Sequence, residues 1–171
     1  MKRYSHLKQK LFIISSLILL LYLFLGFRLY SVEGNSMKPM LNPGDRVLVS
    51  RWSYGFPRIL HTGFFLPWKK AAINDIIVFH SPVEQSLSIK RCIGRDGDLL
   101  TLEHDIYYLN GVPLSPGRIP PAASLHDGII APDWIFLAGD NRPESIDSRF
   151  FGPVSMEYVL GKVVYIRKRH G

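Results

Sequence analysis

The sequence predicts a mainly β protein, in which a single N-terminal transmembrane helix precedes an all-β domain with long loops. A long uncharged run near the N-terminus indicates the helix, and short β-branched or alternating segments between turn residues indicate the strands. The length of 171 residues fits one domain of ordinary size beside such a helix. We therefore expect one anchor and one folded domain.

The anchor is expected in the apolar run Leu11–Phe27, which carries no charge. As a helix this run spans roughly 26 Å, and it reaches ~30 Å, the thickness of a hydrocarbon core, if Arg28 snorkels and the helix continues to Tyr30. A cleavable signal peptide would have a shorter apolar core followed by small residues, whereas Arg28, Leu29 and Tyr30 follow here. The expected division of the chain is a basic tail at 1–10, a transmembrane helix at 11–30 and a folded domain at 31–171.

Positive charge is concentrated at the two ends of the chain. Lys and Arg number 21 against 14 Asp and Glu, which gives a net charge of +7. Because basic residues precede the helix, the positive-inside tendency keeps the N-terminus in the cytoplasm and makes the domain extracytoplasmic. Membrane lipids with anionic headgroups are the expected partner of the basic ends, and nucleic acid is not expected because no interior stripe alternates basic with aromatic residues. The basic residues at the ends are Lys2, Arg3, Lys8, Lys10, Arg167, Lys168 and Arg169.

Short strands are predicted throughout the domain. A turn at Asn42–Asp45 leads into the first of them, and Asn110-Gly111 is a hairpin turn signal. The apolar stretch Ile129–Gly139 is short and contains Pro132, so it is interpreted as strand or core and not as a second membrane span. The expected strands are 46–50, 75–79, 87–91, 99–103, 106–109, 112–114, 134–138 and 159–166.

Two proline-containing stretches, 54–71 and 115–132, interrupt the regular spacing of the strands. We expect long surface loops there, or a small appended subdomain. In the first stretch Phe64, Phe65 and Trp68 either lie against the bilayer interface or pack as a satellite of the core, and both interpretations stay open at this point.

Ser36 is the candidate nucleophile, because it lies in the segment Gly34–Leu41 soon after the apolar run. A serine hydroxyl needs a base, and histidine usually serves. None of the six histidines lies in a recognisable triad motif, so a Ser/His/Asp site using His80 or His104 has no support in the sequence. A lysine base is the other option, and its pKa of ~10.4 must then be lowered by burial or by a nearby positive charge.

Lys90 has surroundings that suit this task. In an extended strand Ser88, Lys90 and Cys92 share one face, so the lysine points toward small neighbours, while the apolar residues of the strand lie on the other face. Lys38 is nearer to Ser36 in the sequence, but we expect it to be a solvated loop charge.

Three segments, in this order and at these distances, resemble the type I signal peptidases, which are membrane-bound serine proteases with a Ser/Lys dyad. They are Gly34–Leu41, Ser88–Gly94 and Gly139–Arg149, and the closing run Gly161–Ile166 is similar to the last strand of that family. The resemblance implies a membrane-anchored serine endopeptidase that cleaves signal peptides from secretory precursor proteins. It also implies a bacterial cytoplasmic membrane location with a single span.

The resemblance assigns roles by position. Ser36 and Lys90 are the implied catalytic residues, as nucleophile and general base. Ser145 would donate or accept a hydrogen bond that holds the amine of Lys90 toward Ser36, and Asp147 would pair with Arg149 to fix the loop. Gly34 stands where some relatives carry a serine that helps to bind the oxyanion, so the backbone N–H of Ser36 would act with another donor.

An extended peptide is the expected ligand of the site. It would add as a strand between the segment Val32–Gly34 and the strand that contains Ile89. Met37 and Ile89 are the expected pocket walls. Similar enzymes favour small residues at the first and third positions before the cut, and the same preference is implied here.

No metal or cofactor is expected, since no His, Cys, Asp and Glu residues cluster at ligand spacing, and Cys92 is alone. One alternative function is a dedicated pilin-maturing peptidase of a conjugation system with the same dyad. Another is a catalytically inactive peptide-binding relative, against which the presence of Ser36, Lys90 and Ser145 argues. A self-cleaving, repressor-like Ser/Lys domain is disfavoured because such proteins are soluble and carry a DNA-binding part.

Overall fold

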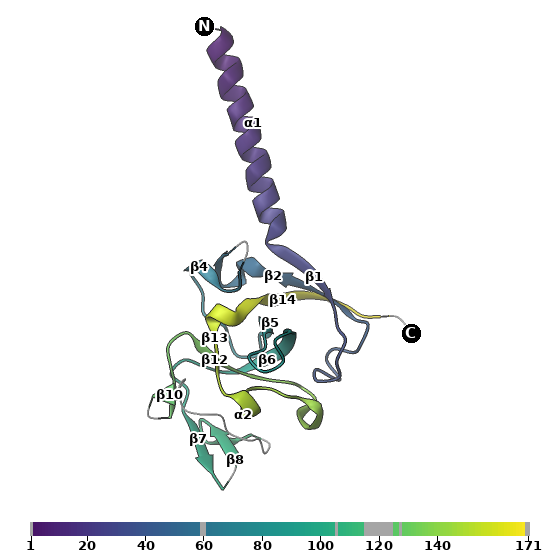
Figure 1. The fold of residues 1–171 in the computed structure, drawn as a ribbon, viewed down its shortest axis with the longest axis vertical. Coiled ribbons are helices and arrows are strands. Elements are labelled where there is room, and N and C mark those ends of the chain that lie inside the picture. The colour runs from purple at the N-terminus through teal and green to yellow at the C-terminus, as the bar shows by residue number, and fades with distance from the viewer. Residues whose placement is uncertain (1, 59–60, 105, 115–124, 127, 170–171) are drawn as a thin grey trace.

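The computed structural model describes residues 2–58, 61–104, 106–114, 125–126 and 128–169. It is mainly β, as predicted, with the helix α1 (Lys2–Leu25) standing away from a β domain (Figure 1). The window Lys8–Leu25 has a mean hydropathy of 1.8 and none of it is buried against the protein. By length and composition this helix can cross a membrane.

The helix ends earlier than the sequence suggested. It stops at Leu25, and Phe27–Ser31 forms strand β1, which pairs antiparallel with β2 (Arg46–Ser50). The predicted helical continuation to Tyr30 is therefore wrong. The mostly apolar residues 27–30 form the edge strand of the sheet, and their backbone N–H and C=O groups form hydrogen bonds with β2.

Gly26 connects the helix to the domain, and Trp52 packs directly against it. A Cβ atom on Gly26 would lie 1.5 Å from Nε1 of Trp52, so the indole occupies the space of a side chain. Trp52 belongs to a short 3₁₀ helix, η1 (Arg51–Ser53), and its ring meets that of Tyr22 edge-on at 4.8 Å. The N–H of Arg51 donates to the carbonyl of Gly26 at 2.8 Å. The end of α1 is thus fixed to the domain by an indole and a backbone hydrogen bond.

A seven-stranded antiparallel sheet forms the centre of the domain, in the order β1-β2-β14-β5-β6-β12-β13. Two of its strands, β2 and β12, have the predicted bounds, while β1 and β13 were not predicted. The other predicted strands of this sheet are present with shifted or longer bounds. The bounds are β5 Ile76–His80, β6 Leu87–Arg95, β12 Trp134–Ala138, β13 Val154–Ser155 and β14 Val159–Arg167, with the short helices η2 Arg142–Glu144, α2 Ser148–Phe151 and η3 Met156–Tyr158 between the last ones.

Small sheets extend the domain away from the centre. In Figure 1 the sheet of β7 (Leu100–Glu103), β8 (Ile106–Leu109) and β9 (Val112–Pro113) lies at the end opposite to α1. Asn110 and Gly111 both have positive φ, 50° and 78°, as the predicted hairpin turn requires. Two further pairs are β3 (Gly55–Pro57) with β4 (Phe64–Pro67) and β10 (Leu125–His126) with β11 (Ile129–Ile130).

The stretch 54–71 is therefore partly a hairpin and not only a loop. Of its three aromatic residues, one packs against the core and two are exposed, and contact of these two with the bilayer stays a prediction. Phe64 packs against the core, whereas Phe65 and Trp68 are 81% and 53% exposed. Most of the second predicted loop, 115–132, lies outside the described residues.

The core covers both faces of the sheet. Ile77 and Phe79 of β5 belong to one buried cluster, and Ile76 and Val78 belong to another. The segment after β1 adds Val32, Met37 and Leu41 to the second cluster. This packing holds the chain around residue 36 against the sheet.

Candidate active site

Ser36 and Lys90 meet in the structure, although 54 positions separate them in the sequence. The ammonium nitrogen of Lys90 donates to Oγ of Ser36 at 2.9 Å. Strand β6 shows the predicted alternation, with Ser88, Lys90 and Cys92 buried and their neighbours more exposed. Lys90 is only 4% exposed, so the strand period places its amine inside the protein and beside the hydroxyl.

Burial lowers the pKa of Lys90 below its ordinary value, because the charged form loses its water. Glu84 and Asp147 act in the opposite direction, but they do not cancel the effect of burial. The lysine is thus more easily neutral than an exposed one, as a general base must be.

Asp147 organises the loop behind the dyad. Its fully buried carboxylate accepts hydrogen bonds from the N–H of Gly139 at 2.9 Å and from Nε of Arg149 at 2.8 Å. The predicted Asp147–Arg149 contact is therefore present, and the side chains are 0% and 2% exposed. Because Arg149 also donates to the carbonyl of Arg142 at 2.8 Å, the pair fixes the loop at both ends.

Ser145 differs from its expected arrangement. Its hydroxyl donates to Oδ2 of Asp147 at 2.6 Å, and among the described residues Lys90 has its side-chain hydrogen bond with Ser36 instead. A carboxylate is a stronger acceptor than a lysine amine that already faces a hydroxyl, which explains the choice. Any influence of Ser145 on the amine therefore passes through Asp147, a charge that acts on Lys90.

Gly139 lies where no side chain would fit. A Cβ atom there would lie 2.2 Å from Oγ of Ser145 and 2.5 Å from the carbonyl oxygen of Ser36. The same carbonyl accepts a hydrogen bond from the N–H of Asn141 at 2.9 Å. The loop 139–141 thus contacts the backbone of Ser36 directly, and a side chain at 139 would displace it.

The ion pair between Arg91 and Asp140 was missed by the sequence analysis. Nε and Nη2 of Arg91 donate to the two carboxylate oxygens of Asp140, each at 2.7 Å. The arginine follows Lys90 in β6, so this bidentate pair fixes the strand that carries Lys90 to the loop that contacts Ser36. The sequence showed only that each of the two segments carries a charged residue of opposite sign at these positions.

The dyad opens into a cleft of about 630 Å³. Strand β12 pairs with β6 only from Arg91 onward, which leaves the edge of 87–90 unpaired on that side. An extended peptide can reach this edge from the cleft. The four residues expected to bind substrate all line it, namely Val32, Gly34, Met37 and Ile89.

Other candidate nucleophiles and bases lie elsewhere or are inert. Lys38, His80 and His104 are exposed, and Ser36 pairs with Lys90. Burial raises the pKa of Cys92 to about 12, so its thiol stays protonated. Within the described ranges no group of three His, Cys, Asp or Glu side chains could hold a metal ion.

A protein-family model described as signal peptidase, peptidase S26, matches residues 5–167. The chain belongs to this family. It is 35% identical to a signal peptidase I of Bacillus caldolyticus, over 80% of this chain and 77% of that protein, and 30% identical to a probable signal peptidase I-1 of Synechocystis, over 87% and 74%. A crystal structure of a signal peptidase I from Enterococcus faecalis is 30% identical, covers 56% of this chain and 98% of its own, and gives a TM-score of 0.42. Membership identifies the chain as a serine peptidase whose substrates are precursor proteins.

The lowered pKa of Lys90 predicts a pH dependence of cleavage. Only the neutral amine can accept the proton of Ser36, so kcat/KM should rise with pH as Lys90 deprotonates and should fall as pH drops through its lowered pKa. The measurement is a pH–rate profile of peptide cleavage. Replacing His80 or His104 by glutamine should leave the fall of kcat/KM at low pH unchanged. A kcat/KM that is constant from pH 6 to 9 would contradict a lysine base.

Proposed function

We propose that this chain is a membrane-anchored endopeptidase that removes signal peptides from exported precursor proteins with the Ser36/Lys90 dyad. The observation that carries the proposal is the 2.9 Å hydrogen bond between Nζ of Lys90 and Oγ of Ser36, inside a cleft that a peptide can enter. Membership of the signal peptidase family supports the class of substrate.

The reaction proceeds through an acyl-enzyme. Oγ of Ser36 attacks the scissile carbonyl carbon while neutral Lys90 takes its proton, and a tetrahedral intermediate forms. The C–N bond then breaks, and the protonated lysine returns the proton to the leaving amine. Lys90, neutral again, activates a water molecule that attacks the ester, the C–O bond breaks, and Ser36 recovers its proton.

The oxyanion of the intermediate needs hydrogen-bond donors. Within the described backbone the N–H of Ser36 forms no backbone hydrogen bond, so it is free to donate to the oxyanion. Gly34 is exposed, and a Cβ atom placed on it would meet nothing within 4 Å. Its lack of a side chain leaves this part of the cleft open to the substrate backbone.

The wall of the cleft supports a preference for small residues before the cut. Met37 and Val32 are core residues, 2% and 6% exposed, so they close the floor of the cleft instead of leaving deep pockets. Ile89 is half-buried on the unpaired edge of β6. A peptide that adds along this edge would place alternate side chains against these apolar walls.

The helix α1 serves as the membrane anchor in this proposal, with the N-terminus in the cytoplasm and the domain outside. The basic residues before the apolar window support this orientation. Protease added to spheroplasts should digest the domain after Ser31 and leave α1 and its N-terminal residues intact. Recovery of an undigested domain from intact spheroplasts, with digestion only after lysis, would reverse the topology.

The test of the proposed function is cleavage of a secretory precursor by the detergent-solubilised protein, with the cut mapped by mass spectrometry. A single cut at the end of the signal peptide is expected. A panel of unrelated precursors distinguishes a general signal peptidase from a dedicated pilin-maturing one, which would cut a single member. No cut in any precursor would refute the proposal.

A further inference from the structure

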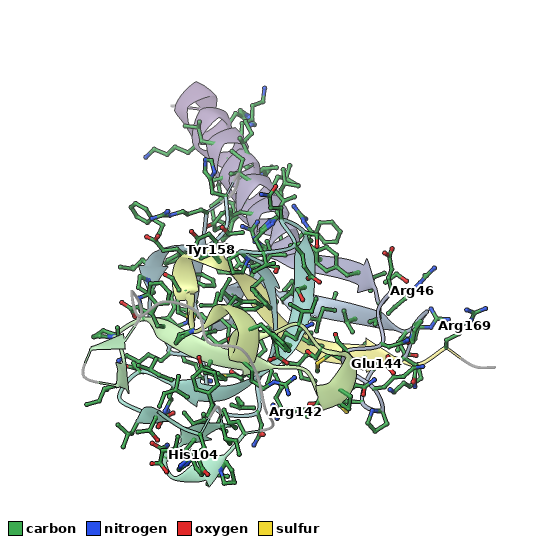
Figure 2. The ribbon with its side chains drawn as sticks, turned by 60° about the horizontal axis from the view of Figure 1, so that its bottom comes forward. Arg46, His104, Arg142, Glu144, Tyr158 and Arg169 are labelled. Atoms are coloured by element: carbon green, nitrogen blue, oxygen red, sulfur yellow. The ribbon has the colours of Figure 1, made fainter. Side chains whose placement is uncertain are left out.

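A second pocket, of about 460 Å³, adjoins the catalytic cleft and is strongly basic. Ser31 lines both spaces, so they share a wall. Arg46, Arg167 and Arg169 line the pocket, and all three are exposed. Figure 2 shows Arg46 and Arg169 projecting from the same side of the domain.

Arg46 and Arg167 are like charges at paired positions of the sheet, and no carboxylate among the described residues neutralises them. Arg46 and Arg167 stand directly opposite each other in the pairing of β2 with β14. Like charges at such cross-strand positions destabilise a sheet. Within the described part of the chain, neither of these guanidinium groups has a carboxylate partner.

The carboxylate of Asp45, next to Arg46 in the sequence, already has hydrogen-bond donors. Asp45 accepts hydrogen bonds from the backbone N–H of Arg169 at 2.8 Å and from Nζ of Lys168 at 3.1 Å. These contacts, with one from the N–H of Asn42, hold the pKa of Asp45 well below its usual range. The pocket therefore keeps an excess of positive charge.

The catalytic cleft has the opposite charge along its walls. Glu33, Glu84 and Glu144 line it, so an anionic group on a bound peptide would be repelled there. At the Ser31 end, by contrast, the same group would meet the arginines. A negative side chain of a bound peptide would therefore be disfavoured in the catalytic cleft and favoured in the arginine pocket.

We infer that the pocket of Arg46, Arg167 and Arg169 is a subsite for an acidic side chain of the precursor, on the N-terminal side of the cut. This inference rests on the proposed function, in which Val32 and Gly34 contact the residues before the cut. Ser31 precedes Ser36 by five residues. A peptide that runs extended alongside this segment advances ~3.3 Å per residue, so a side chain beside Ser31 would belong to about the fifth residue before the scissile bond. A carboxylate there would form charge-assisted hydrogen bonds with the guanidinium groups of Arg46 and Arg167, which have no carboxylate partner among the described residues.

The test uses the full chain in neutral detergent and peptides that differ by one side chain. A glutamate is moved through the positions before the cut, and at each position glutamine and lysine replace it. Cleavage should be fastest with glutamate at about the fifth position, roughly fivefold above glutamine in kcat/KM. Raising the salt concentration should reduce this preference.

Variants assign the preference to the pocket. The double variant Arg46→Gln, Arg167→Gln should cleave the glutamine peptide like wild type and lose the preference for glutamate, and Arg46→Glu with Arg167→Glu should favour the lysine peptide. Arg95→Gln is the matched control, since Arg95 is exposed in β6 and does not line this pocket. Thermal melts verify that each variant is folded.

Binding separates failure of this inference from failure of the proposed function. The Ser36→Ala chain should bind a fluorescent glutamate peptide more tightly than the glutamine peptide, as read by anisotropy, even if no precursor is cut. Equal binding and equal cleavage of the two peptides would overturn the subsite. The subsite would also be overturned if the double variant kept the glutamate preference but lost binding to phosphatidylglycerol vesicles. In that case the arginines would bind lipid headgroups.

Discussion

Ser36→Ala and Lys90→Met should each abolish precursor cleavage and leave the fold intact. Each removes one partner of the hydrogen bond between Nζ and Oγ, without which neither attack nor proton transfer can occur. The expected loss is on the order of 10⁴-fold or more in kcat, and the double variant should resemble either single one because a nucleophile and its base act as a unit.

The melting temperature distinguishes loss of chemistry from loss of structure. Lys90 is buried with a lowered pKa, so the unfolded chain binds its proton more readily than the folded one, and a buried methionine should not reduce stability near neutral pH. Lys38→Met is the matched control, because Lys38 is close to Ser36 in the sequence but exposed. Full activity of either dyad variant, or loss of activity in the control, would contradict the assignment.

Asp147→Ala should cost about 3–5 kcal/mol of unfolding free energy, in addition to activity. The substitution leaves the guanidinium of Arg149 buried, and it removes the acceptor of the Gly139 N–H and of the Ser145 hydroxyl. Arg149→Ala should cost a comparable amount, because it leaves the carboxylate buried without its cation. Urea unfolding of the three proteins measures the loss.

An exposed ion pair is the control for this prediction. Lys70 pairs with Asp96, and its side chain is 63% exposed, so Lys70→Ala should change the free energy of unfolding by less than ~1 kcal/mol. If Asp147→Ala melted like wild type while Lys70→Ala unfolded early, the buried pair would not be what holds the loop behind the dyad.

The parts of this structure that follow from local periodicity could be predicted. The two-residue period of β6 predicts that Ser88, Lys90 and Cys92 share one face, and turn residues such as Asn110-Gly111 locate the hairpins. The Ser36/Lys90 contact and the Asp147–Arg149 contact were implied by the resemblance of their segments to the type I signal peptidases.

What could not be predicted depends on contacts between distant segments. Hydropathy cannot distinguish an apolar helix end from an apolar edge strand, so β1 became visible only through its pairing with β2. The Arg91–Asp140 pair joins residues 49 positions apart, and nothing local indicates it. The resemblance assigned Ser145 to Lys90 by its position in the motif, but the partner that its hydroxyl takes depends on geometry that a motif does not contain.

In the proposed anchored arrangement, the closely packed connection at Gly26 would determine the height of Ser36 above the bilayer. Because the Trp52 indole fills the space beside Gly26 and β1 starts at the next residue, there is no slack between anchor and sheet. The distance from the end of α1 to Ser36 is therefore a fixed length. One helical turn measures ~5.4 Å, so precursors whose apolar helices differ by a turn present their cleavage sites at different heights. In this arrangement the rigid connection would select precursors by the height of their cleavage site, in addition to selection by side chain.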